Sequence, residues 1–120
     1  MQIARLMLPC FVLLWALPLG ATTSLGFDGG DYSITMEIGH DTGPVVASLR
    51  VHTPRAADGV FLYGNFNTVA FDVEKRILSI EFIQQDVGQE PGSFMLMVRG
   101  EQATLQIDDK VITRPFSWFM

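Results

Sequence analysis

The chain after residue 21 alternates apolar and polar residues over most of its length, and this spacing restricts it to β-structure. The clearest case is 31–38, where apolar side chains occupy every second position: Tyr32, Ile34, Met36 and Ile38. Successive side chains of a β-strand point to opposite faces, so this spacing predicts a strand with one buried face. No segment after residue 21 carries the i, i+3, i+4 spacing of an amphipathic helix.

A dense group of turn-forming residues separates this strand from the next one and predicts a β-hairpin. Residues 39–44 read GHDTGP, and the segment that follows alternates again. For both apolar sets to face one core, Ile38 must lie opposite Val45. The same register pairs Tyr32 with Val51. A slip by one residue would turn one apolar set toward solvent, so the pattern itself predicts the register.

The remaining segments predict an all-β fold. Residues 22–30 are expected to form a loose N-terminal lead, and residues 54–59 a loop. Further segments with strand-like spacing are separated by turns or loops: 60–63, 66–73, 77–84, 93–98, 103–107 and 111–113. Seven or eight short strands with hairpin connections indicate a small antiparallel β-sandwich or barrel-like domain. We therefore expect residues 22–120 to form a single β domain.

Residues 1–21 have the layout of a secretory signal peptide. Arg5 precedes an apolar run, and the small residues Gly20 and Ala21 follow that run. The apolar run, residues 6–19, is shorter than the roughly 20 residues that span a bilayer, and prolines interrupt it. We therefore expect cleavage after Ala21, export to the periplasm or the medium, and no membrane anchor in the mature protein.

The charge distribution excludes one class of partner. The chain has a formal net charge of −5, and its 8 Lys and Arg residues are scattered along the sequence. A surface that binds nucleic acid needs clustered basic residues to neutralise phosphates. We therefore expect no nucleic-acid partner.

The histidine and cysteine residues offer no metal site. Cys10 is the one cysteine and lies within the predicted signal peptide, so the mature domain is expected to be free of disulfides. The predicted hairpin places His40 and His52, the two histidines, at opposite ends, with His52 beside Asp31. Zinc ligands must approach the metal to about 2 Å, so the two imidazoles are not expected to share an ion. We expect neither a metal nor a cofactor.

The triplet Asp41-Thr42-Gly43 is the feature that suggests catalysis. In retropepsin-type aspartic proteases, a D-T-G loop supplies one carboxylate and a second copy of the chain supplies the other. Two such carboxylates share a proton and activate water for peptide hydrolysis. Here His40 precedes the triplet and Pro44 follows it, which favours an ordinary hairpin turn. A retropepsin-like homodimeric aspartic protease with Asp41 as its catalytic residue is therefore the alternative function.

Met95 and Met97 share one face of a predicted strand. If no second sheet covers that face, it forms an exposed apolar patch of the kind that marks a partner surface, and methionines suit adaptable contacts. Phe66, Ile77 and Ile83 are expected on an equivalent outer face. The simpler interpretation buries both faces within one sandwich.

Together these features predict a non-enzymatic binding or accessory module outside the cytoplasm. An inhibitor, an immunity-type protein or an envelope-assembly protein would fit this description. Its expected partner is another protein, and Met95 and Met97 are the expected contact residues.

Overall fold

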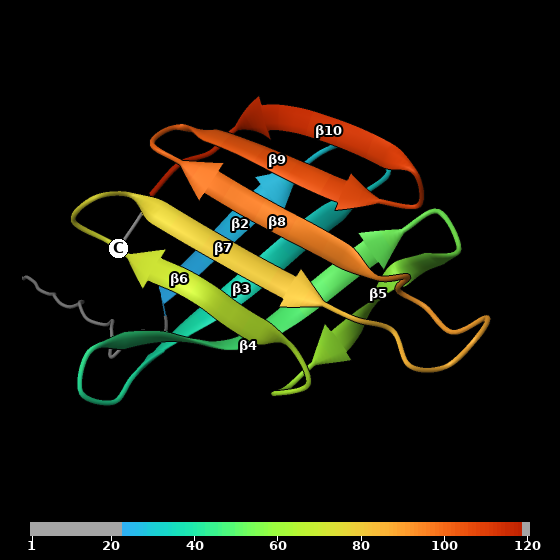
Figure 1. The fold of residues 1–120 in the computed structure, drawn as a ribbon, viewed down its shortest axis with the longest axis horizontal. Coiled ribbons are helices and arrows are strands. Elements are labelled where there is room, and N and C mark those ends of the chain that lie inside the picture. Colours follow the sequence, from blue (N-terminus) through green and yellow to red (C-terminus); the bar gives the residue numbers. More distant parts are fainter. Residues whose placement is uncertain (1–22, 119–120) are drawn as a thin grey trace, which may run out of the picture.

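The computed structural model describes residues 23–118, which form nine strands in two antiparallel sheets (Figure 1). One sheet has four strands in the order β2-β3-β4-β5, and the other has five in the order β10-β9-β8-β7-β6. The strand bounds are β2 Thr23–Asp28, β3 Ser33–His40, β4 Pro44–Thr53, β5 Ala56–Leu62, β6 Asn67–Asp72, β7 Ile77–Phe82, β8 Phe94–Arg99, β9 Gln102–Ile107 and β10 Lys110–Pro115. The predicted all-β fold class is confirmed. The predicted signal peptide lies outside the described residues.

Each strand pairs with its neighbour in sequence, so the two sheets are successive meanders. The chain passes from one sheet to the other once, between β5 and β6, and these two strands do not pair. On the opposite side of the molecule β10 lies against β2. Figure 1 shows the strands of the five-stranded sheet running across those of the four-stranded sheet behind it. This crossed arrangement is one of the two common ways in which sheets pack face to face.

The core lies between the two sheets and is built from the inward sets of alternating residues. The clearest sets come from β8 and β9, whose predicted inward residues are all buried: Phe94, Leu96, Val98, Ala103, Leu105 and Ile107. Their register is regular, with Phe94 opposite Ile107 and Leu96 opposite Leu105. Burying apolar side chains from both sheets is the main stabilising contribution available to such a domain.

The predicted register of the first hairpin is wrong because β4 contains a β-bulge. Ile38 lies opposite Val46 rather than Val45, and the register shifts between Glu37 and Ile38. An extra residue in one strand of a pair reverses which side chains face the core. Val46 consequently packs against the core, whereas Val45 is 42% exposed.

The structure has nine strands rather than the seven or eight predicted, because the expected N-terminal lead forms one. The expected N-terminal lead contains β2, which pairs with β3 along its whole length and buries Leu25 and Phe27. Most of the expected 54–59 loop belongs to β5, which pairs with β4. The turn between β4 and β5 is therefore much tighter than expected.

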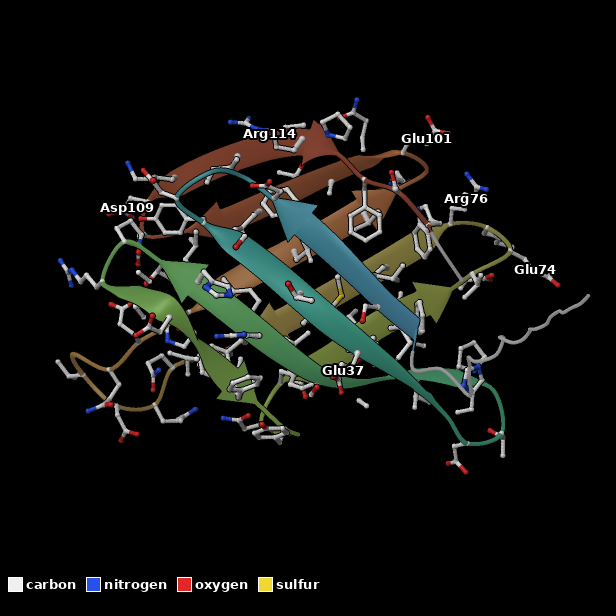
Figure 2. All side chains as sticks on the ribbon, turned by 180° about the vertical axis from the view of Figure 1, so that it is seen from behind. Glu37, Glu74, Arg76, Glu101, Asp109 and Arg114 are labelled. Atoms are coloured by element: carbon white, nitrogen blue, oxygen red, sulfur yellow. The ribbon has the colours of Figure 1, made fainter. Side chains whose placement is uncertain are left out.

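Two ends of the sandwich are built differently. Figure 2 shows Asp109 at one end and Arg76 with Glu101 at the other. The Asp109 end carries the β2–β3, β4–β5, β7–β8 and β9–β10 connections. At the Arg76 end the C-terminal segment folds back: Phe116 is buried, and the indole Nε1 of Trp118 donates a 2.6 Å hydrogen bond to the carbonyl of Gly100. Within residues 23–118 no helix is long and apolar enough to cross a membrane.

Candidate functional site

The outer face of the five-stranded sheet carries Met95 and Met97. Both are on β8, where they alternate with the buried residues Phe94, Leu96 and Val98. Met97 is 38% exposed and Met95 is half-buried. No other described element pairs with or packs over this face, so the methionines do not belong to the core between the two sheets.

The middle of this face is uncharged. Met97 lies opposite Ser79 on β7 and Thr104 on β9, and Thr104 lies opposite Thr113 on β10. The hydroxyl groups of Thr104 and Thr113 are 3.3 Å apart, within hydrogen-bond distance. We call this row of four side chains, together with Met95, the methionine surface. Depletion of charge at the centre is the compositional mark of protein interfaces.

Charged side chains flank the methionine surface rather than interrupt it. Glu81 lies opposite Met95, and Arg99 lies at the far end of β8 opposite Ile77. Of the other residues expected near this face, Ile77 is half-buried and Ile83 is exposed, but Phe66 packs against the core instead. The expectation for Phe66 is therefore wrong, because the link from β5 to β6 turns its ring inward.

An aromatic ladder on the opposite sheet was missed by the sequence analysis. On β5 and just after it, Phe61 is 50% exposed and Tyr63 is 73% exposed. Their rings stack with centroids 5.7 Å apart and planes 10° apart. The guanidinium of Arg50, opposite Phe61 on β4, lies 5.0 Å from the Phe61 ring centroid. Arg50, Phe61 and Tyr63 therefore form a three-member ladder that faces solvent.

A bulge in the β4–β5 pair holds this ladder in place. Arg50 donates hydrogen bonds of 2.6 and 3.2 Å from Nη2 and Nε to the carbonyl of Asp58. The His52 ring Nδ1 lies 2.9 Å from the carbonyl oxygen of Ala57. Gly59 has a φ of 87°, and a Cβ there would lie 2.8 Å from the Arg50 side chain. Only glycine combines this backbone conformation with that close approach.

The catalytic candidate Asp41 lies in the exposed turn between β3 and β4. Its backbone N–H donates a 2.9 Å hydrogen bond to the carbonyl of Gly43, as expected of a tight turn. A retropepsin site would take its second carboxylate from another copy of the chain, so the protease alternative stays a prediction.

The two histidines lie apart, as expected from the hairpin. His40 pairs with Pro44 beside the β3–β4 turn, and His52 pairs with Ser33 at the other end. The predicted partner of His52 was Asp31, and that pairing is wrong because the register differs from the predicted one. Among residues 23–118, no group of three or more His, Cys, Asp or Glu side chains is placed to hold a metal ion.

Side-chain hydrogen bonds tie the connections at the Asp109 end together. The Tyr32 hydroxyl donates a 3.2 Å hydrogen bond to Asp108, and the Thr53 hydroxyl donates a 2.8 Å hydrogen bond to Glu90. Burial of the phenol raises the pKa of Tyr32, and the adjacent Asp108 carboxylate raises it further. A shallow hollow of about 340 Å³ lies here, between the β4–β5 and β9–β10 turns.

No protein-family model, curated protein or solved structure matches this chain. Two solvent-facing surfaces, the methionine surface and the aromatic ladder, are the candidate binding sites of residues 23–118.

Proposed function

We propose that this chain is a non-enzymatic binding or accessory module that works outside the cytoplasm and binds another protein through the methionine surface. The observation that carries the proposal is the uncharged row around Met97. A chain with a formal net charge of −5 keeps the centre of a broad, solvent-facing sheet free of ionised side chains. A partner can cover such a centre without the large cost of desolvating unpaired charges.

The chemistry of the surface suits a protein partner. A methionine side chain is flexible and polarizable, so it adapts to the shape of what covers it. The hydroxyls of Ser79, Thr104 and Thr113 can exchange hydrogen bonds with a partner backbone or with bridging water. Glu81 and Arg99 are placed to pair with charges at the rim, where they contribute to orientation more than to affinity.

The methionine surface is backed by the packed core. The side chains directly beneath it are fully buried: Leu78, Ile80, Leu96 and Leu105. A preorganised surface loses little conformational freedom when a partner binds. An inhibitor, an immunity-type protein and an envelope-assembly protein each require such a surface, and the predicted signal peptide supports a location in the periplasm or the medium.

A matched pair of substitutions tests the proposal. Met97→Glu places a charge in the centre of the methionine surface, and Val45→Glu places one at a site of similar exposure (42% against 38%) on the other sheet. Tagged wild-type protein and both variants are recovered from envelope fractions after cross-linking, and the attached proteins are identified by mass spectrometry. Circular dichroism verifies that each variant is folded.

The expected result is a protein that is attached to the wild type and to Val45→Glu but lost from Met97→Glu. An unchanged set of attached proteins with a folded Met97→Glu variant would contradict the proposal. The alternative function, a homodimeric aspartic protease, has Asp41 as its one candidate catalytic residue, and it predicts acid-dependent peptide cleavage that Asp41→Asn abolishes.

A further inference from the structure

The aromatic ladder lies on the sheet opposite to the methionine surface, among hydrogen-bonding side chains. In the row that crosses the ladder, Arg50 lies between Thr35 on β3 and Phe61 on β5. In the next row Glu37 lies opposite Ser48. Leu49 pairs with Leu62, the last residue of β5, and Ser48 and Tyr63 are the next residues along the chain from this pair.

The two aromatic rings are not equally available to a ligand. Phe61 is contacted by both the Arg50 guanidinium and the Tyr63 ring. Tyr63 is 73% exposed, so most of its ring surface reaches solvent. The face of an aromatic ring carries negative charge density, which attracts weakly positive C–H groups as well as cations. Tyr63 therefore offers a stacking surface, and Phe61 holds it in position.

Ser48 provides a second and independent observation at this surface. Its position on β4 directs it to the outer face, yet it is only 8% exposed. Between residues 23 and 118, no hydrogen bond joins its hydroxyl to another residue. A buried hydroxyl without a hydrogen-bond partner is energetically costly, and such groups are rare in native proteins. A ligand that brings a hydrogen-bonding group to Ser48 would remove that cost.

The side chains around Tyr63 both donate and accept hydrogen bonds. Glu37 contributes a carboxylate that accepts hydrogen bonds, and Arg50 contributes N–H groups that donate them. Thr35 and Ser48 can do both. These four side chains carry no net formal charge and supply both donors and acceptors, which matches a ligand rich in hydroxyl groups.

We propose that this surface binds a neutral oligosaccharide. The C–H face of one sugar ring stacks on Tyr63, and its hydroxyl groups exchange hydrogen bonds with Glu37, Ser48 and Arg50. A protein partner is a poorer match, because the aromatic anchors of protein interfaces are surrounded by contacts that exclude water, whereas polar groups surround Tyr63. This inference is independent of the protein partner proposed for the methionine surface.

The test is a titration of the full chain, labelled with ¹⁵N and followed by amide chemical shifts. The probes are hexamers of β-1,4-linked glucose and of β-1,4-linked N-acetylglucosamine, the corresponding monosaccharides, and an anionic hexamer of galacturonic acid. We expect a neutral hexamer to shift the amides of Glu37, Ser48 and Tyr63, with weaker shifts from its monosaccharide and none at these amides from the anionic hexamer.

Three variants make the test specific. Tyr63→Ala should weaken binding of the hexamer by roughly tenfold or more, as expected for removal of an aromatic anchor. Tyr63→Phe keeps the ring and should bind nearly as the wild type does. Ile83→Ala, an exposed apolar residue elsewhere on the molecule, should leave binding unchanged. Tyr63 is mostly exposed, so the Ala variant is expected to fold, and circular dichroism checks this.

Three results would overturn the inference. One is no shift with either neutral hexamer at millimolar concentration. Another is a set of shifts centred on the methionine surface or on the Asp109 end. The third is binding that a folded Tyr63→Ala variant retains in full.

Discussion

Replacing Gly59 in the β4–β5 bulge with alanine should lower the free energy of unfolding for two reasons, a backbone cost and a lost side-chain contact. Gly59→Ala places a Cβ at a φ of 87°, where it would lie 2.8 Å from the Arg50 side chain and 2.9 Å from the His52 ring. The backbone conformation alone costs about 1–2 kcal/mol for a residue with a Cβ. The clash also displaces Arg50, which loses its contact with Phe61, worth about 0.5–1 kcal/mol at an exposed site. We expect a total loss of about 1.5–3 kcal/mol in the free energy of unfolding.

Gly30 supplies the matched control for this substitution. Its φ of 89° is almost the same, but a Cβ there would have no atom within 4 Å. Gly30→Ala should therefore show the backbone cost alone, about 1–2 kcal/mol. Urea denaturation measures both variants, and with a slope of about 1–3 kcal/mol per molar urea the difference between their midpoints should be resolvable. Equal losses for the two variants would refute the argument that Gly59 is required by the approach of Arg50 and His52.

Further predictions concern the core, the pH dependence of stability and the two functional alternatives. Leu96→Ala should lower the free energy of unfolding by about 2–5 kcal/mol, because it leaves a cavity between fully packed sheets; a loss below 1 kcal/mol in urea denaturation would contradict the packing described. The raised pKa of Tyr32 means that the native state holds its phenolic proton more tightly than the unfolded state. The contribution of Tyr32 to stability is therefore present below about pH 10 and is lost as the pH rises further. Between pH 8 and pH 11, the urea midpoint should fall more for the wild type than for Tyr32→Phe. Equal falls for the two proteins would count against this role of Tyr32. Met97→Glu should change the free energy of unfolding by less than about 0.5 kcal/mol, as expected of a surface position, and a large loss would place Met97 in the core. Asp41→Asn should leave the chain unchanged in peptide-cleavage assays from pH 3 to pH 7, since neither form is expected to cleave; cleavage by the wild type alone would favour the protease.

The regular hairpins could be predicted from sequence because their two strands alternate without interruption. Between Phe94 and Ile107, a short turn joins two perfect period-two segments, and only one register buries both apolar sets. The absence of helical spacing also identified the fold class. These features are local, and tertiary contacts did not override them.

The bulged hairpins could not be predicted because the residues involved fit either face. Val45, Val46 and Ala47 are all apolar, so their pattern does not show which one is the extra residue. Asp58 and Gly59 have the composition of a turn, although they lie within β5. Composition alone does not distinguish a turn from a bulge, since both use glycine at positive φ.

The aromatic ladder was missed for a similar reason. Val60, Phe61, Leu62 and Tyr63 are consecutive apolar residues, so the sequence does not show which pair faces solvent. Pairing of Leu49 with Leu62 decides this by turning Leu62 inward and Phe61 outward. Arg50 gives the one available signal, because it lies between the inward residues Leu49 and Val51, and a charged residue opposite Phe61 marks that row as the outer face.

Site-specific photo-cross-linking tests the central claim, which is that the methionine surface contacts a partner protein. A photoreactive amino acid is placed at position 97 in one variant and at position 45 in another, two sites of similar exposure on opposite sheets. Irradiation of intact cells should give a discrete cross-linked protein from position 97 and none from position 45. Identical products from the two positions, or no product from position 97 in a folded variant, would contradict the account.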